Sequence, residues 1–184
     1  TQTAKNYTVT LNTNEGTINA GNVTSYTYGE GATLPTNVTK TGYTFDGWYK
    51  EPTCTNKVTT LGATDYTSDI TLYAKWTINS YSTRWKLAGG QLNGNSDDIV
   101  QDYEFGQAIT APTGIERVGF NFIGWEPTVP TTMPAENLEF TAQWEEKQLI
   151  NFRTLCTYDI VLKNNYVDDD SKDGHTTITA THTS

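Results

Sequence analysis

The strongest constraint on this chain is an internal repeat. Within its 184 residues, residues 28–35 read YGEGATLP and residues 105–112 read FGQAITAP, so that Gly and Pro recur 77 positions apart. The same spacing relates GYTFDGW at residues 42–48 to GFNFIGW at residues 119–125. Such ordered self-similarity indicates that one structural unit occurs twice.

A third pair of blocks sets the limits of the two copies. Residues 70–76 read ITLYAKW and residues 138–144 read LEFTAQW, at a spacing of 68. Spacing that changes between ordered blocks indicates insertions and deletions in surface loops. We therefore expect one module at residues 1–78, a second at residues 79–147, and a C-terminal segment at residues 148–184.

The hydrophobic pattern within each copy has the period of a β-strand. Tyr7, Val9 and Leu11 alternate with threonines, and the block at residues 70–76 alternates in the same way, with Tyr73 facing outward. A period of two favours strands with one face on a core and one in water. The 35 Thr and 11 Tyr also suit a pleated surface. The sequence thus predicts a mainly β fold.

Two features interrupt this alternation. The aromatic parity breaks before Trp48, which predicts a β-bulge at Gly47 and, by repetition, at Gly124. The proline-initiated segments 35–41 and 112–118 are each expected to form a short helix or a turn. We expect no long helix.

The C-terminal segment departs from the repeat. Strand-like stretches at residues 158–167 and 175–182 are joined by an acidic turn, which predicts a β-hairpin. A lone hairpin is marginal in water, so we expect this one to lead into another unit or to pair with one.

The charge of the chain excludes several classes of partner. The formal net charge is −9, and residues 79–147 carry 4 Lys and Arg against 10 Asp and Glu. Because no basic stripe occurs, we expect no binding to nucleic acid. No run of about 18 apolar residues occurs, so we expect no membrane insertion in this segment.

We also expect the sequence to be an excerpt of a longer protein.

The repeated blocks resemble a known family. Residues 42–49 and 69–76, together with residues 119–125 and 140–144 of the second copy, are similar to the Listeria–Bacteroides repeat. This is the internalin B-repeat family of bacterial cell-surface proteins. The resemblance covers roughly residues 5–145.

The resemblance implies two tandem small modules of β-grasp-like (ubiquitin-like) architecture. It also implies an extracellular location, at the cell surface or in the cell wall, and a role as the stalk of an adhesin. Partners would be neighbouring repeats and, in some cases, a host protein or a glycan. The second copy departs from the family pattern where Pro127, Pro130 and Pro134 replace a longer loop.

Nothing in the sequence assembles a catalytic site. The two histidines, His175 and His182, both lie in the C-terminal segment, with no nucleophile or orienting acid placed beside them. The family supplies no catalytic residues either. We expect no enzyme activity and no cofactor.

One acidic stretch invites a calcium interpretation. Asp169, Ser171 and Asp173 carry oxygen donors at alternate positions and precede Gly174, as in the first half of a calcium loop. The twelfth position is Ala180, which cannot supply the bidentate carboxylate. We favour a solvated hairpin turn and expect no metal site.

Covalent modification remains open at two sets of residues. Cys54 and Cys156 are the only cysteines, and either two unpaired thiols or one long-range disulfide fits the sequence. Asn6, Asn22 and Asn37 begin three N-x-Thr sequons in the first copy, which makes them candidate glycosylation sites.

The aromatic residues divide between a core and a candidate binding surface. Trp48 and Trp76 recur as Trp125 and Trp144, Trp76 and Trp144 are in phase with core residues, and we expect the recurring tryptophans to be in the core. Tyr49 and Tyr66 lie in or near expected loops and Tyr73 on the outward phase, so these three are the candidates for stacking on a glycan.

Three functional hypotheses follow. The first is a stalk that separates other domains. The second is a module that binds a glycan or a host protein. The third is a filament or pilus subunit that self-associates when the hairpin at residues 148–184 pairs with a sheet edge of the next copy.

Overall fold

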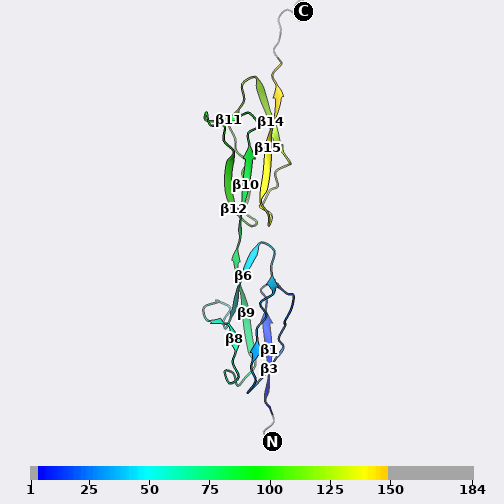
Figure 1. The fold of residues 1–184 in the computed structure, drawn as a ribbon, viewed down its shortest axis with the longest axis vertical. Coiled ribbons are helices and arrows are strands. Elements are labelled where there is room, and N and C mark those ends of the chain that lie inside the picture. The colour runs from blue at the N-terminus through cyan, green and yellow to red at the C-terminus, as the bar shows by residue number, and fades with distance from the viewer. Residues whose placement is uncertain (1–3, 149–184) are drawn as a thin grey trace, which may run out of the picture. The chain divides into compact units, whose positions relative to one another are not determined.

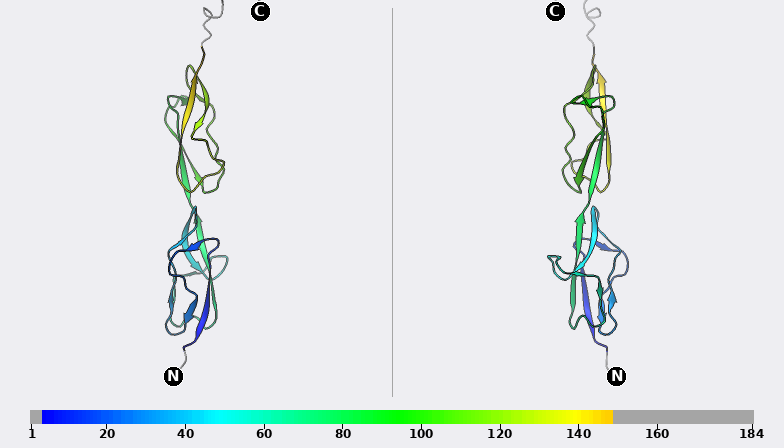
Figure 2. Two further views of the ribbon diagram at one scale, coloured as in Figure 1. Left: turned by 90° about the vertical axis from the view of Figure 1, so that its right-hand side faces the viewer. Right: turned by 60° about the vertical axis from the view of Figure 1, so that its left-hand side comes forward.

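The computed structural model describes residues 4–148. Both repeats lie within one compact unit, which ends at Glu145. Every regular element among the described residues is a strand (Figure 1 and Figure 2). The prediction of a mainly β fold is confirmed.

The first repeat, which we call module 1, forms a five-stranded sheet in the order β3-β1-β9-β6-β7 (Figure 1). Its two central strands are parallel, with Val9 opposite Ile70, and its other pairings are antiparallel. The long chain between β1 and β9 permits this parallel pairing, which no tight turn could make. The strands are β1 (Asn6–Asn12), β3 (Ser25–Thr27), β6 (Tyr43–Tyr49), β7 (Lys57–Val58) and β9 (Ile70–Ile78).

Short strand pairs supply the rest of module 1. The segment at residues 35–41, expected to be a helix or a turn, contains strand β5 instead. Leu34 and Val38 are buried against the sheet, and the Trp48 indole donates a hydrogen bond of 2.8 Å to the carbonyl of Pro35. Extended backbone therefore covers the sheet in the segment where a short helix or a turn was expected. The pairs are β2 (Thr17–Ile18) with β5 (Val38–Thr39) and β4 (Ala32–Thr33) with β8 (Thr60–Leu61).

The second repeat, module 2, forms a four-stranded sheet in the order β12-β10-β15-β14. Its central strands are again parallel, with Thr83 opposite Leu138, and a strand again replaces the helix or turn expected at residues 112–118. Among the described residues, module 2 has no counterpart of β7. The strands are β10 (Ser80–Lys86), β11 (Gln91–Leu92), β12 (Ile99–Glu104), β13 (Ile115–Glu116), β14 (Phe120–Glu126) and β15 (Leu138–Glu146), with β11 paired to β13.

Aromatic residues dominate both small cores. In module 1, Trp48 is buried and Trp76 packs against the buried cluster, which confirms the core role predicted for them. In module 2, Trp85 is fully buried, with its ring centroid 4.4 Å from that of Phe140 and 4.9 Å from that of Trp125. Because each large ring buries much apolar surface, a chain with only 35% apolar residues can form a hydrophobic core in each of its two modules.

The predicted bulge is present in β6. The register of β6 against β9 shifts between Phe45 and Gly47, and Gly47 has φ 146. Gly124 has φ 141 at the matching position of β14. Glycine is required at both positions because other residues rarely adopt this backbone conformation.

One residue separates the last strand of module 1 from the first strand of module 2. The amide of Asn79 donates a 2.9 Å hydrogen bond to the carbonyl of Gly42, and its carbonyl accepts one of 2.9 Å from the amide of Phe105. Its side-chain oxygen accepts a 2.6 Å hydrogen bond from the Thr44 hydroxyl. The ring of Tyr43 meets that of Phe105 edge-on at 5.9 Å. Asn79 is therefore hydrogen-bonded to module 1 through its amide and to module 2 through its carbonyl.

Candidate contact surface and repeated clamp

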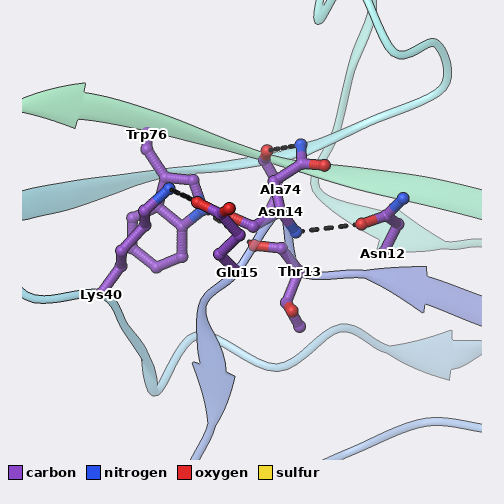
Figure 3. Close-up of polar contacts among 7 residues, drawn as sticks. All are labelled: Asn12, Thr13, Asn14, Glu15, Lys40, Ala74 and Trp76. Carbon is purple, nitrogen blue, oxygen red and sulfur yellow. Dashed lines mark hydrogen bonds and ion pairs between the residues drawn. The ribbon is translucent and has the colours of Figure 1, made fainter.

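A lysine holds the first turn of module 1 against the sheet (Figure 3). Lys40 Nζ donates a hydrogen bond of 3.1 Å to the carbonyl of Asn14 and forms an ion pair of 3.0 Å with Glu15. The same ammonium lies 4.6 Å from the ring centroid of Tyr43. Asn14 also donates to the carbonyl of Ala74 at 2.6 Å, so that this residue of the turn is bonded to two other segments of the module (Figure 3).

An arginine makes two of these three contacts in module 2. Arg117 Nη1 donates a 3.2 Å hydrogen bond to the carbonyl of Ala88, and its guanidinium lies 3.9 Å from the ring centroid of Phe120. A cation over an aromatic face contributes about 0.5–1 kcal/mol at exposed sites. We call this repeated arrangement of cation, turn carbonyl and aromatic ring the clamp.

A tryptophan also donates a hydrogen bond to this turn in each module. In module 1 the indole of Trp76, which Figure 3 draws beside the turn, donates to the carbonyl of Thr13 at 2.9 Å. A Cβ on Gly16 would overlap the ring of Trp76. In module 2 the Trp144 indole donates to the carbonyl of Leu87 at 2.9 Å. A Cβ on Gly90 would overlap that ring in the same way. Both glycines are needed because the indole occupies the space of a side chain.

Sequence reasoning missed the clamp, although the signal was present. Lys40 and Arg117 stand 77 positions apart, as do Tyr43 and Phe120, directly beside the repeated block that begins at Gly42. A cation and an aromatic residue three positions apart in both copies could have revealed it.

In module 1, polar side chains form a cluster on the outward face of β6 and β9. Tyr49 donates a short hydrogen bond to the carboxylate of Asp46, and Lys57 forms an ion pair of 3.3 Å with the same carboxylate. Lys75 Nζ lies 5.1 Å from the ring centroid of Tyr49, and Tyr73 lies directly across from Tyr49 on β9. We call these five residues the Tyr49 cluster.

Hydrogen bonding shifts two pKa values in this cluster. The hydrogen bond from Tyr49, with smaller help from Lys57, lowers the pKa of Asp46 below its usual value. The same bond, assisted by burial, raises the pKa of Tyr49 to about 12. Asp46 is therefore ionised and Tyr49 protonated across the physiological range.

The structure brings together two of the three predicted binding tyrosines. Tyr49 is the last residue of β6 rather than part of a loop, and only 6% of its surface is exposed. This corrects its expected role as an exposed stacking platform. Tyr73 is half-buried beside it. Tyr66 packs edge-on against Tyr26, with ring centroids 5.8 Å apart, and burial raises its pKa.

The remaining candidate residues are placed only in part. Cys54 is half-buried in the loop between β6 and β7, whereas Cys156 lies outside the described residues, so the disulfide stays a prediction. The acidic turn with Asp169, Ser171 and Asp173, and the hairpin that contains it, also lie outside them. The three sequon asparagines are exposed, namely Asn6, Asn22 and Asn37.

The described residues contain neither a metal cluster nor a membrane-spanning helix. Within residues 4–148, no three His, Cys, Asp or Glu side chains gather as a metal site would require. The part of the chain that the structure covers contains no helix of the length and hydrophobicity needed to cross a membrane.

Comparison with known proteins gives matches along most of the repeat region. The family model of the Listeria–Bacteroides repeat domain matches residues 7–75 and again residues 91–143. Internalin H of Listeria monocytogenes is 32% identical over 135 residues, which cover 67% of this chain and 23% of that protein.

Two proteins of Evansella cellulosilytica are also similar. One, named as a membrane protein, is 32% identical over 125 residues, or 64% of this chain and 18% of its own length. The other, named as a Gly-rich membrane protein, is 37% identical over 98 residues, or 53% of this chain and 11% of its own length. The chain thus spans less than a quarter of each of these three relatives. No solved structure matches it significantly.

The matches fall on the segments that the geometry repeats. Each matched range contains the aromatic strand with its bulge glycine and most of the last strand, and it ends one residue before the tryptophan of that strand. Two of these relatives are named as membrane proteins and the third as an internalin, and these names are consistent with a protein of the cell surface. The chain belongs to the Listeria–Bacteroides repeat domain family and carries two tandem copies of its repeat.

Proposed function

We propose that this chain is a non-catalytic extracellular segment of a surface adhesin, and that it acts as a stalk that spaces other domains. The observation that carries the proposal is the junction at Asn79. A flexible linker leaves its backbone groups to water. Here the backbone amide and carbonyl of Asn79 bond to residues on either side, Gly42 and Phe105.

The side chains around Asn79 support the same role. A Cβ on Gly42 would overlap the ring of Phe105, so module 2 packs directly on the backbone of module 1 at that point. The hydroxyl of Thr44 bonds to the Asn79 side chain, and Tyr43 packs against Phe105. These contacts restrict bending between the modules, which is the property a spacer needs.

The repeated residues also support a non-catalytic role. The side chains that the two copies share build cores, the bulge and the clamp. The polar cluster around Tyr49 is not repeated, because module 2 has Ile123 and Glu126 in place of Asp46 and Tyr49. What both copies retain is therefore packing and turn geometry.

Surface display tests the spacer role. The chain is placed between a membrane anchor and a fluorescent reporter, and energy transfer from the reporter to a dye in the bilayer is measured. We expect transfer to be lower than with a Gly/Ser linker of the same number of residues, because such a linker coils. Equal transfer for the chain and the linker would contradict the proposal.

A second candidate function is contact with a glycan or a host protein through the Tyr49 cluster. The observation that favours it is the half-buried ring of Tyr73 beside Lys75 on the outward face of β9. Saturable binding on a glycan or host-protein array that Tyr73→Ala abolishes would support it. Tyr28→Ala, which removes an exposed tyrosine away from this face, is the matched control.

A further inference from the structure

The first and last strands of each module lie side by side and run parallel. In module 1, residues 9–12 of β1 lie opposite residues 70–73 of β9 (Figure 1). In module 2, residues 83–86 of β10 lie opposite residues 138–141 of β15. The chain therefore enters each module on one strand and leaves it on the neighbouring strand, at the opposite end of the pair.

This arrangement decides how a module responds when its two ends are pulled apart. The start of β1 and the end of β9 lie at opposite ends of the parallel pair, so tension slides one strand past the other. The evenly spaced hydrogen bonds of a parallel pair then carry the load together and must break in one step. If both pulled points lay at the same end of the pair, the bonds would break one at a time.

A side-chain oxygen extends the pair before its first backbone register position. In module 1 the amide of Thr8 donates a 2.8 Å hydrogen bond to the carboxylate of Asp69. In module 2 the amide of Ser82 donates one of 2.9 Å to the side-chain oxygen of Asn137. Asp69 and Asn137 each directly precede the last strand of their module. The two modules thus keep this bond although the accepting residue differs.

Indole hydrogen bonds extend the pair at its other end. Trp76 of β9 and Trp144 of β15 each donate a 2.9 Å hydrogen bond to a carbonyl one residue beyond the first strand of their module. In module 1 the side-chain amide of Asn14 adds a 2.6 Å bond to the carbonyl of Ala74 in β9. Bonds at both ends of the pair are therefore repeated in the two modules.

We propose that each module bears tension, and that the parallel pair of its first and last strands is the element that resists unfolding under load. The proposal rests on the stalk role for the source of that load, because a stalk between an anchor and a bound partner is pulled at both ends. Only Asn79 separates β9 from β10, so tension passes from the last strand of module 1 into the first strand of module 2. Forced unfolding depends on the unfolding rate, so the resistance is measured as a lifetime under load.

Magnetic tweezers that hold the 184-residue chain at constant force test the proposal by comparing two pulling directions. In the first direction the chain is held by its two termini, which loads both strand pairs along the strands. In the second it is held by its N-terminus and by Ser68→Cys, with Cys54 and Cys156 replaced by Ser. Ser68 is exposed two residues before β9, beside the start of the pair, so this direction opens the pair one bond at a time.

We expect module 1 to survive at least about tenfold longer under the end-to-end load than under the Ser68 load at the same force, because several hydrogen bonds must then break together. Each module should unfold in one step of about 20–25 nm, since an extended chain spans about 3.3–3.6 Å per residue. Equal lifetimes in the two directions would overturn the proposal. This comparison leaves the residues of the strand pair unaltered.

Two substitutions of exposed aspartates separate the strand pair from general stability. Asp69→Ala removes the bond at the start of the module 1 pair, whereas Asp65→Ala removes an equally long 2.8 Å bond to the amide of Gly62, within one turn. Urea unfolding establishes that both variants are folded. We expect only Asp69→Ala to shorten the end-to-end lifetime of module 1, by about fivefold.

Equal shortening by the two substitutions would show that the strand pair is not the element that resists load. The energy-transfer test of the spacer role is made without tension, so the two proposals fail separately. A chain that keeps its reporter away from the bilayer but unfolds equally fast in both pulling directions spaces domains without resisting load.

Discussion

At the residue scale, positions without a side chain are as informative as those with one. Gly16 and Gly90 each leave room for a tryptophan ring that donates to a turn carbonyl. Glu15, by contrast, has φ 70, where Gly89 stands in module 2. The two copies therefore form the same turn with different degrees of backbone strain.

Gly16→Ala and Gly90→Ala are expected to lower the free energy of unfolding by roughly 1–3 kcal/mol each, because an added methyl group overlaps an indole ring. Urea unfolding followed by circular dichroism measures this. In a Trp76→Phe background the cost of Gly16→Ala should shrink, since the overlapping ring edge is gone. An unchanged cost in that background would contradict the packing argument.

Glu15→Gly is expected to stabilise the chain by roughly 0.5–1 kcal/mol, because glycine adopts a positive φ without strain. The exposed ion pair with Lys40 that it removes contributes less. Gly89→Glu in module 2 is the reverse substitution and should destabilise. Thermal unfolding that shows both changes moving stability in the same direction would refute this account.

The hydrogen bond between Tyr49 and Asp46 has a pH signature. A raised pKa means that the protonated phenol stabilises the fold fully below pH 10 and that this contribution is lost as pH rises through about 12. The lowered pKa of Asp46 gives a contribution that is present at neutral pH and is lost as pH falls.

Absorbance at 295 nm between pH 9 and 12.5 can detect the tyrosine. We expect Asp46→Asn to make one tyrosine ionise at a lower pH than in the unmodified chain, although burial still keeps its pKa above the ordinary value. Tyr49→Phe, which removes the group, is the control and should lose only the latest-ionising signal. Identical curves for the unmodified chain and Asp46→Asn would show that the hydrogen bond does not hold the proton.

At the scale of elements, the sequence predicted those that local pattern determines. The alternation of Ile70, Leu72 and Ala74 with outward residues correctly predicted β9, and the broken parity before Trp48 correctly predicted the bulge. Both predictions depend only on residues that are close together in the sequence. The helix or turn expected at residues 35–41 was wrong, because Val38 and Leu34 cover the sheet from extended backbone.

The candidate contact surface was harder to predict because its contacts join residues that are far apart in the sequence. Tyr73 was correctly placed on the outward face from its phase alone. The burial of Tyr49 depends on Lys57 and Lys75, which come from a strand pairing that no short-range pattern specifies. The clamp likewise joins Lys40 to a turn 26 residues earlier.

At the scale of the whole molecule, the spacer role depends on the junction between the two modules. Asn79 is bonded to Gly42 on one side and Phe105 on the other. If those bonds persist in solution, the two modules move as one body. If they do not, the spacer role loses the observation that carries it.

Pulsed dipolar electron paramagnetic resonance tests this most directly. Spin labels are attached at Thr71→Cys in β9 and Asp102→Cys in β12, both exposed, with Cys54 and Cys156 replaced by Ser. The account predicts one narrow distance distribution, which broadens when three glycines are inserted after Asn79. A distribution that is already broad before the insertion would contradict it.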